Sequence, residues 1–83
     1  MYAVYLHPRA AKSLRKIDSR YLPRIKRALR SLEFHPHIGK ALGGELEGSF
    51  VIRVWPYRII YTIDNGRLVV AVIDIAHRQG AYK

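Results

Sequence analysis

The sequence predicts one small α+β domain, in which an αα-hairpin packs on one face of a mostly antiparallel sheet. Its 83 residues suffice for one domain and not for two. In the first half, apolar residues recur at intervals of three and four, which is the period of a helix. The second half consists of short runs rich in β-branched and aromatic residues. The predicted order is β-α-α-β-β-β, and we expect the first strand to pair inside the sheet.

The first half of the chain predicts a strand at residues 2–6 followed by two helices. Pro8 suits the first turn of the first helix, because its missing N–H is not needed there. Pro23 lies near the start of the second helix, and Pro36 cannot continue it. A loop is expected at residues 40–49, which contain three glycines. The apolar stripes are Ala10, Leu14 and Ile17 in the first helix, and Leu22, Ile25, Leu29 and Leu32 in the second.

The second half predicts three strands, at residues 50–55, 57–63 and 68–75. Pro56 separates the first two, because proline cannot donate to the ladder of a central strand. Asn65-Gly66 lies between the last two, and Asn-Gly in this position is the strongest short-range signal for a hairpin. The three strands should therefore follow one another in an antiparallel meander.

Positive charge is the strongest global property of the sequence. Fifteen Lys and Arg oppose six Asp and Glu, which gives a net charge of +9. Self-repulsion of this size opposes compaction, so we expect a polyanionic partner, with RNA favoured over an acidic protein or anionic lipid. The cations of the predicted helices lack the mixed signs of an ordinary solvated face, which predicts contacts with RNA, the ribosome or an acidic protein. They are Arg9, Lys12, Arg15, Lys16, Arg24, Lys26, Arg27 and Arg30.

Several classes of protein are not expected from this sequence. It has no cysteine, which excludes disulfides and thiolate metal sites and suits a reducing cytoplasm. Its histidines and acids lack metal-ligand spacing, so we expect neither a metal nor a cofactor. Residues 1–12 lack the pattern of a signal peptide, and the longest apolar run, residues 68–73, is far shorter than the ~20 residues of a membrane helix. A cytoplasmic location without a membrane role is expected.

Three arginines in the predicted strands form the candidate site. Arg53, Arg58 and Arg78 come from segments that should be neighbours in the sheet, so their side chains can converge on one surface. An arginine in so apolar a strand as that of Arg53 is either paired with a buried carboxylate, with Asp74 as the candidate, or placed on a working face. Guanidinium groups bind phosphate in a bidentate manner, so the second alternative predicts a phosphate site.

His77 and Tyr82 are further candidates near the end of the sequence. His77, beside Arg78, can serve as a general acid or base, or it is an ordinary hydrogen-bonded histidine at a strand end. The phenol of Tyr82 can donate a proton or stack on a base, or its ring packs over the sheet edge. The residues alone leave both pairs of alternatives open.

Two short motifs carry a resemblance to a known family. They are Tyr57-Arg58-x-x-Tyr61 and His77-Arg78-x-x-x-Tyr82. Together with the order of elements and the glycine-rich loop at residues 42–50, they resemble the RelE/ParE superfamily of bacterial toxins, over nearly the whole chain. The RelE branch cuts mRNA in the ribosomal A site. This implies that a ribose 2′-OH attacks the adjacent phosphate and expels a 5′-OH.

The resemblance also implies roles for individual residues. Arg58 matches the arginine that stabilises the developing charge on the phosphate, and Arg78 matches a second arginine that contacts it. Tyr82 matches the terminal tyrosine that orients or stacks on a base. Arg53 falls near one of two lysine positions in the preceding strand, whereas the other position is Val51 here. That departure removes one candidate general base, and His77 is the reserve candidate.

The resemblance further implies a function and partners. The expected function is the toxin of a type II toxin–antitoxin system that acts as a ribosome-dependent mRNA endonuclease. The expected partners are an acidic cognate antitoxin, the ribosome and mRNA, with operator DNA contacted only through the antitoxin complex. The alternatives are a ParE-like toxin that inhibits DNA gyrase and a module that binds nucleic acid without cutting it. The set Arg58, Arg78 and Tyr82 favours the RelE branch.

Overall fold

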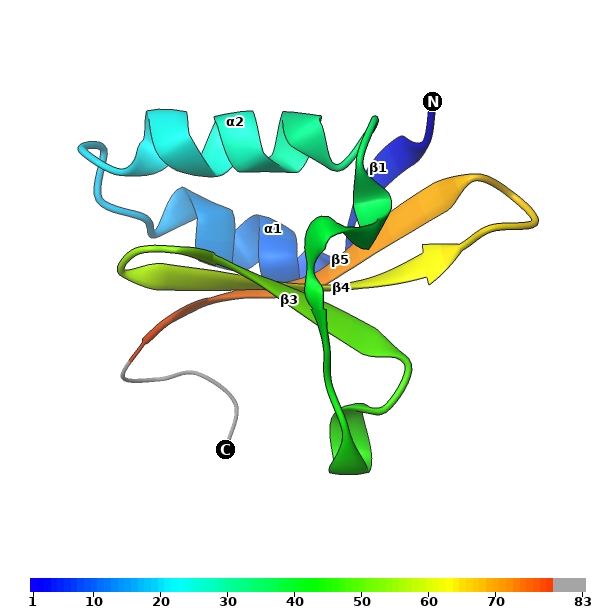
Figure 1. Ribbon diagram of the computed structural model, residues 1–83. Helices are drawn as coiled ribbons and strands as arrows, with labels where there is room; N and C mark the ends of the chain where they lie inside the picture. The colour runs from blue at the N-terminus through cyan, green and yellow to red at the C-terminus, as the bar shows by residue number, and fades with distance from the viewer. Residues whose placement is uncertain (79–83) are drawn as a thin grey trace.

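Two helices lie on one face of a five-stranded sheet in the computed structural model, which describes residues 1–78 (Figure 1). The helix α1 packs against β5, and α2 packs against β3. The elements are β1 (Ala3–Leu6), α1 (Pro8–Arg15), α2 (Leu22–Ser31), β2 (Lys40–Ala41), β3 (Ser49–Val54), β4 (Tyr57–Asp64) and β5 (Val69–His77), with 3-10 turns η1 (Pro36–Ile38) and η2 (Gly44–Leu46). The α+β class and the predicted helical hairpin on one face are confirmed.

The sheet is mixed, with the order β1-β5-β4-β3-β2. The strands β3, β4 and β5 form the expected antiparallel meander, whereas β1 pairs with β5 in parallel. The prediction that the first strand pairs inside the sheet was wrong, because β1 lies at an edge of the sheet that residues 1–78 form and pairs there with β5. The short turns of the meander leave only the outer edges of β3 and β5 open, so a strand that precedes the helices can join only at an edge.

Local signals placed the helix starts correctly. Pro8 and Pro23 both lie in the first turn of their helices. His7 precedes α1, and its Nδ1 accepts a hydrogen bond from the backbone N–H of Arg9 at 3.3 Å. The helix α1 ends at Arg15, so Ile17 reaches the core from the connection that follows the helix.

Two features of the loops differ from the prediction. The expected loop at residues 40–49 contains β2, whose Lys40 pairs with Val51 of β3, and two residues are too few to show a strand period. The hairpin between β4 and β5 exists, but its turn is longer than Asn65-Gly66 alone. The Oδ1 of Asp64 accepts from the N–H of Arg67 at 3.1 Å, and within this turn the residue with positive φ is Leu68 and not Gly66.

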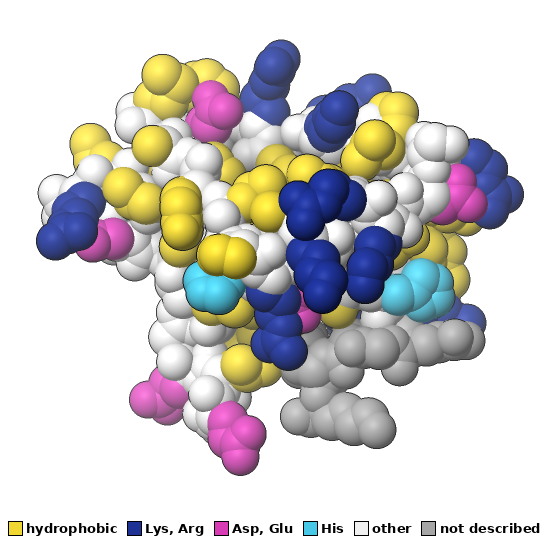
Figure 2. Space-filling model, turned by 180° about the vertical axis from the view of Figure 1, so that it is seen from behind, with side chains coloured by type: hydrophobic (Ala, Val, Ile, Leu, Met, Phe, Trp, Pro, Cys, Tyr) yellow, Lys and Arg dark blue, Asp and Glu magenta, His cyan; other side chains and the backbone are white. Residues whose placement is uncertain are grey.

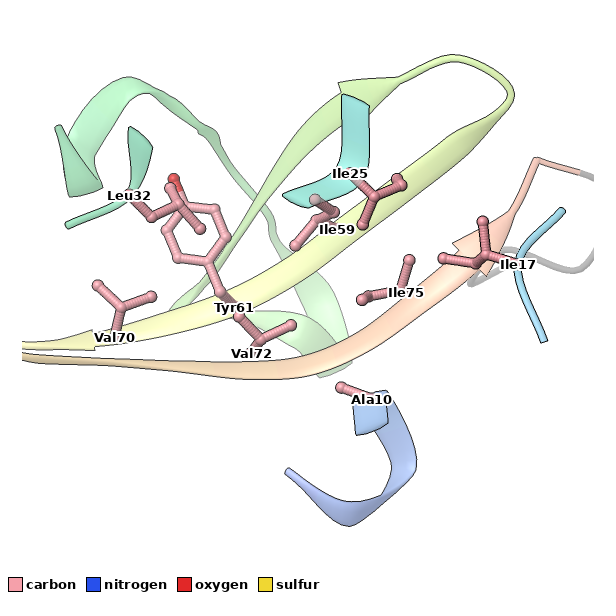
Figure 3. Close-up of a cluster of buried hydrophobic side chains, with 9 residues drawn as sticks. All are labelled: Ala10, Ile17, Ile25, Leu32, Ile59, Tyr61, Val70, Val72 and Ile75. Carbon is pink, nitrogen blue, oxygen red and sulfur yellow. The ribbon is translucent and has the colours of Figure 1, made fainter. Parts of the chain in front are cut away.

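The core lies between the helices and the sheet (Figure 3). Tyr61 is its largest fully buried side chain, and its hydroxyl donates to the carbonyl of Pro36 at 2.8 Å and accepts from the N–H of Gly39 at 3.0 Å. This hydroxyl anchors the segment after α2 to the centre of β4, and burial raises the pKa of the phenol. The residues of the core are Ala10, Ile17, Ile25, Leu32, Ile59, Tyr61, Val70, Val72 and Ile75.

Candidate functional site

Two arginines stand directly opposite each other on the sheet face that the helices leave open. Arg53 of β3 and Arg58 of β4 are cross-strand partners, next to the pairs that carry Ile52 and Ile59 on the helix side. Like charges in this position destabilise a sheet. Neither arginine forms an ion pair with a carboxylate of residues 1–78. The pair therefore indicates a site at which a bound anion would offset the repulsion between the two guanidinium groups.

Arg78 joins this pair from the end of β5. Its backbone N–H donates to the carbonyl of Pro56 at 2.8 Å, and its own carbonyl accepts from Nη1 of Arg58 at 3.3 Å. Its guanidinium lies over the ring of Trp55, 4.8 Å from the ring centroid. We call Arg53, Arg58 and Arg78 the arginine cluster. With Trp55, Pro56 and Tyr57, the cluster lines a hollow of about 60 Å³.

The arginine cluster is suited to bind phosphate. Guanidinium groups stay charged at every physiological pH and carry five N–H donors each. Arg58 uses one donor on the carbonyl of Arg78, which holds its side chain in place and leaves other donors for a ligand. The alternative that Arg53 pairs with Asp74 is not observed, because that carboxylate accepts from Oγ of Ser13 at 3.2 Å and from the N–H of Ile75 at 2.8 Å.

The structure does not bring His77 into the arginine cluster. His77 pairs with Tyr57 across β4 and β5, and the two rings meet edge to face at 5.4 Å. It lines a different hollow, together with Ser13, Lys16 and Asp74. Tyr57 borders both hollows and thus separates the imidazole from the guanidinium groups. Tyr82 lies outside the described residues.

The position of Val51 agrees with its apolar character. Its side chain is buried on the same sheet face as Arg53. It helps to line a groove of about 660 Å³ between α2 and the β2–β3 pair, with Ile38, Leu42 and Ile52 as further apolar walls. Arg53 borders both this groove and the hollow of the arginine cluster. Sequence reasoning did not assign Lys40, which also lines the groove and becomes recognisable only once β2 is placed beside β3.

The eight helix cations are all exposed, as expected for a binding surface. Figure 2 shows Lys and Arg side chains gathered near the middle of the face opposite to the view of Figure 1. Ion pairs in the described part of the chain join Asp18 to Arg20 at 2.9 Å and Asp64 to Arg67 at 3.8 Å, and both lie in connections between elements. The positive charge of the helices is therefore left uncompensated among residues 1–78.

Trp55 is the residue of the site that sequence reasoning missed. The sequence marks it only as the last residue of the apolar strand expected at residues 50–55, yet its side chain is 63% exposed and contacts Arg78. The available signal was that this tryptophan directly precedes Pro56 at a turn between two arginine-bearing strands. Within residues 1–78, no helix is long and apolar enough to cross a membrane, and no three His, Asp or Glu side chains gather as a metal site requires.

Known proteins resemble this chain in sequence and in fold. The family model described as the ParE toxin of the type II toxin–antitoxin system parDE matches residues 4–82. The chain is 32% identical to Toxin RelE of Mycobacterium tuberculosis (strain ATCC 25618 / H37Rv), over 99% of this chain and 87% of that protein.

Two solved structures of toxin–antitoxin complexes contain a chain of the same fold. The RelBE2 complex of Mycobacterium tuberculosis matches with a TM-score of 0.86 and 32% identity, over 93% of this chain and 98% of that one. The intact RelBE complex of E. coli matches with a TM-score of 0.81 and 25% identity over the whole of both chains.

Proposed function

The chain belongs to the RelE/ParE family of toxins of type II toxin–antitoxin systems, and from this premise we propose that it is a ribosome-dependent mRNA endonuclease. The observation that carries the proposal is the cross-strand pair of Arg53 and Arg58, completed by Arg78. Three guanidinium groups around one small hollow suit a phosphate that gains charge during the reaction.

The proposed reaction is an internal transesterification of the mRNA strand. The 2′-oxygen of a ribose forms a bond to the adjacent phosphorus, and the bond from phosphorus to the 5′-oxygen of the next nucleotide breaks. The leaving 5′-oxygen takes up a proton from water. The upstream fragment then ends in a 2′,3′-cyclic phosphate, and the downstream fragment begins with a 5′-OH. The arginine cluster neutralises the charge that develops on the phosphorane, and Arg58 is its central member because the backbone of Arg78 fixes it.

The arginine cluster stabilises charge but contributes little to positioning the nucleophile. Correct positioning can lower a barrier by about 7–11 kcal/mol. We assign this part to the ribosome, which can hold the mRNA in an in-line geometry. The proton of the 2′-OH leaves to a group outside the cluster. His77 is the candidate acceptor, and since Tyr57 borders both its hollow and that of the cluster, the proton reaches it through water.

The partners follow from charge and from the two related complexes. The net charge of +9 and the exposed cations of α1 and α2 suit an acidic antitoxin and, in its absence, ribosomal RNA. The groove beside Arg53 combines apolar walls with the cation Lys40, which suits an amphipathic acidic segment of the antitoxin. We assign contacts with operator DNA to the antitoxin.

A second candidate function is inhibition of DNA gyrase without nuclease chemistry. Two observations favour it: the matching family model is described as a ParE toxin, and Val51 is buried where the RelE resemblance expects a lysine. A third candidate is a module whose basic helices bind nucleic acid without cutting it. Assays of mRNA cleavage, gyrase supercoiling and nucleic-acid binding separate these three functions.

The test compares the native chain with Arg58→Ala and a matched control. Arg67→Ala is the control, because Arg67 lies in the β4–β5 turn beside Asp64 and outside the arginine cluster. Purified protein is added to mRNA, with and without ribosomes, and the 5′ ends are mapped. We expect cutting only with ribosomes, a loss of about 10²–10³ in rate for Arg58→Ala, and no change for Arg67→Ala.

Two outcomes would change the assignment. If the native chain cuts nothing but inhibits supercoiling by gyrase, the ParE-type function is correct. If it binds ribosomes tightly without cutting and leaves gyrase unaffected, the chain is a binding module. Cutting by a folded Arg58→Ala variant at the native rate would remove the arginine cluster from the mechanism.

A further inference from the structure

Trp55 is the single tryptophan of the chain, and its position is unusual. It follows the last residue of β3, and its side chain is 63% exposed. A scattered apolar side chain at the surface is normal in itself. This one, however, forms a wall of the hollow that holds the arginine cluster.

The indole ring is held in place by its neighbours. The guanidinium of Arg78 lies over it at 4.8 Å from the centroid, which is a cation–π contact. The backbone of Arg78 is in turn bonded to Pro56, the residue after Trp55. Pro56 itself is buried. An exposed aromatic ring is therefore presented at a fixed place beside three cations.

We propose that Trp55 is a stacking platform for one nucleobase of the RNA strand whose phosphate the arginine cluster binds. The proposal rests on the proposed function, because it takes single-stranded RNA as the ligand. Proteins bind unpaired bases on aromatic rings and on guanidinium planes, while cations hold the adjoining backbone. Trp55 and Arg78 offer these two flat groups next to Arg58, so a base and the phosphate of the same nucleotide can be held together.

The hollow itself favours RNA over a protein as the ligand of Trp55. Its volume of about 60 Å³ has no room for a large side chain of a partner, and three of its six lining residues are arginines. A nucleotide places its base outside such a hollow and only its phosphate inside. Stacking on an indole tolerates every base, so Trp55 contributes affinity and position and does not select one sequence.

The first experiment uses Trp55 as its own reporter. The native chain is titrated with a single-stranded RNA heptamer in the absence of ribosomes, and the tryptophan fluorescence is recorded. We expect quenching that saturates with the RNA concentration, since the chain has no other tryptophan. Inorganic phosphate at the same ionic strength should leave the fluorescence nearly unchanged. An RNA that binds without any change in fluorescence would overturn the proposal.

The second experiment separates stacking from an indirect effect through Arg78. Trp55→Leu and Trp55→Phe are compared by the anisotropy of a fluorescein-labelled heptamer, with circular dichroism to confirm folding. Phe34→Leu is the matched control, because Phe34 is 60% exposed and follows α2 outside the site. We expect Trp55→Leu to weaken binding by about 5- to 150-fold, the loss that one base stack represents, and Trp55→Phe to weaken it less.

RNA heptamers that lack the base at one position decide whether Trp55 stacks on a base or only positions Arg78. If Trp55 stacks on a base, removing that base weakens the native chain and abolishes the difference between native and Trp55→Leu. If Trp55 only positions Arg78, Trp55→Leu weakens binding equally to intact and abasic RNA, and the proposal is wrong. Loss of antitoxin affinity with unchanged RNA affinity would assign Trp55 to a protein contact and would also overturn it.

The assays separate the stacking role of Trp55 from the proposed cleavage of mRNA. These assays contain no ribosome and measure no cleavage. Ribosome-dependent cutting that persists in Trp55→Leu at the native rate, with unchanged RNA affinity, would refute the stacking role and leave the function intact. Base-dependent quenching in a chain that cuts no mRNA would support the stacking role and refute the function.

Discussion

The hydroxyl of Tyr61 offers a quantitative test of how the fold is held together. Tyr61→Phe removes one oxygen and leaves the carbonyl of Pro36 and the N–H of Gly39 without the partner they have at 2.8 and 3.0 Å. An unsatisfied buried donor or acceptor costs about 1–3 kcal/mol. The two groups together predict a loss of about 2–6 kcal/mol in the free energy of unfolding. In a domain of this size, each kcal/mol lowers the Tm by about 4–8 °C.

Urea unfolding followed by circular dichroism measures this loss. Tyr5→Phe is the matched control, because Tyr5 is 56% exposed on β1 and should change the free energy of unfolding by less than about 0.5 kcal/mol. A Tyr61→Phe variant as stable as the control would refute the inference that this hydroxyl anchors the segment after α2.

The pH dependence of unfolding gives the same test independently. Burial raises the pKa of the Tyr61 phenol above its usual value of 10.0. The unfolded chain therefore releases this proton first, so the contribution of Tyr61 to stability is full below pH 10 and is lost as the pH rises through the folded pKa. We expect the native chain to lose more stability than Tyr61→Phe between pH 9 and 11, the range around that reference value. Equal slopes for the two proteins would contradict the burial of the phenol.

Three further predictions concern the contact between Gly39 and Tyr61 and the charges of β3 and α2. A Cβ at Gly39 would overlap the hydroxyl of Tyr61, so Gly39→Ala should destabilise the native chain by about 1–3 kcal/mol. The same substitution should destabilise a Tyr61→Phe variant less, which a double-mutant cycle measured by urea unfolding tests. Arg53→Gln removes a like charge opposite Arg58, so it should stabilise the fold by about 0.2–1 kcal/mol while weakening phosphate or RNA binding; lower stability in thermal melting would contradict this reasoning. Reversal of Arg24, Arg27 and Arg30 to Glu should weaken ribosome binding and flatten its dependence on salt, and unchanged affinities for both ribosome and antitoxin would refute a binding role for α2.

Residues with a local or periodic signal could be predicted from the sequence, and those that depend on tertiary pairing could not. Pro8 and Pro23 mark helix starts by backbone chemistry, and strand alternation placed Arg58 on the face opposite to Ile59. The edge position of β1 and the short strand β2 follow from how the meander closes, which no local pattern encodes.

The candidate site shows the same division. Arg53, Arg58 and Arg78 meet as expected, because neighbouring strands bring them together. The contact between Trp55 and Arg78 joins a turn to the end of another strand, so spacing in the sequence gives no sign of it. Adjacent residues of a strand point to opposite faces of the sheet. His77 therefore lies on the face of its cross-strand partner Tyr57, and Arg58 points to the other face.

The pairing of β1 with β5 has a consequence for the timing of synthesis. Among residues 1–78, the first strand pairs with residues 69–77 alone, so the sheet cannot close while the chain is still being translated up to that point. The arginine cluster is completed at the same late stage, because Arg78 must bond to Pro56. Contacts between such distant segments form slowly, since a long loop must close first. A nascent chain therefore lacks the complete site until residues 69–78 have been made and have joined the sheet.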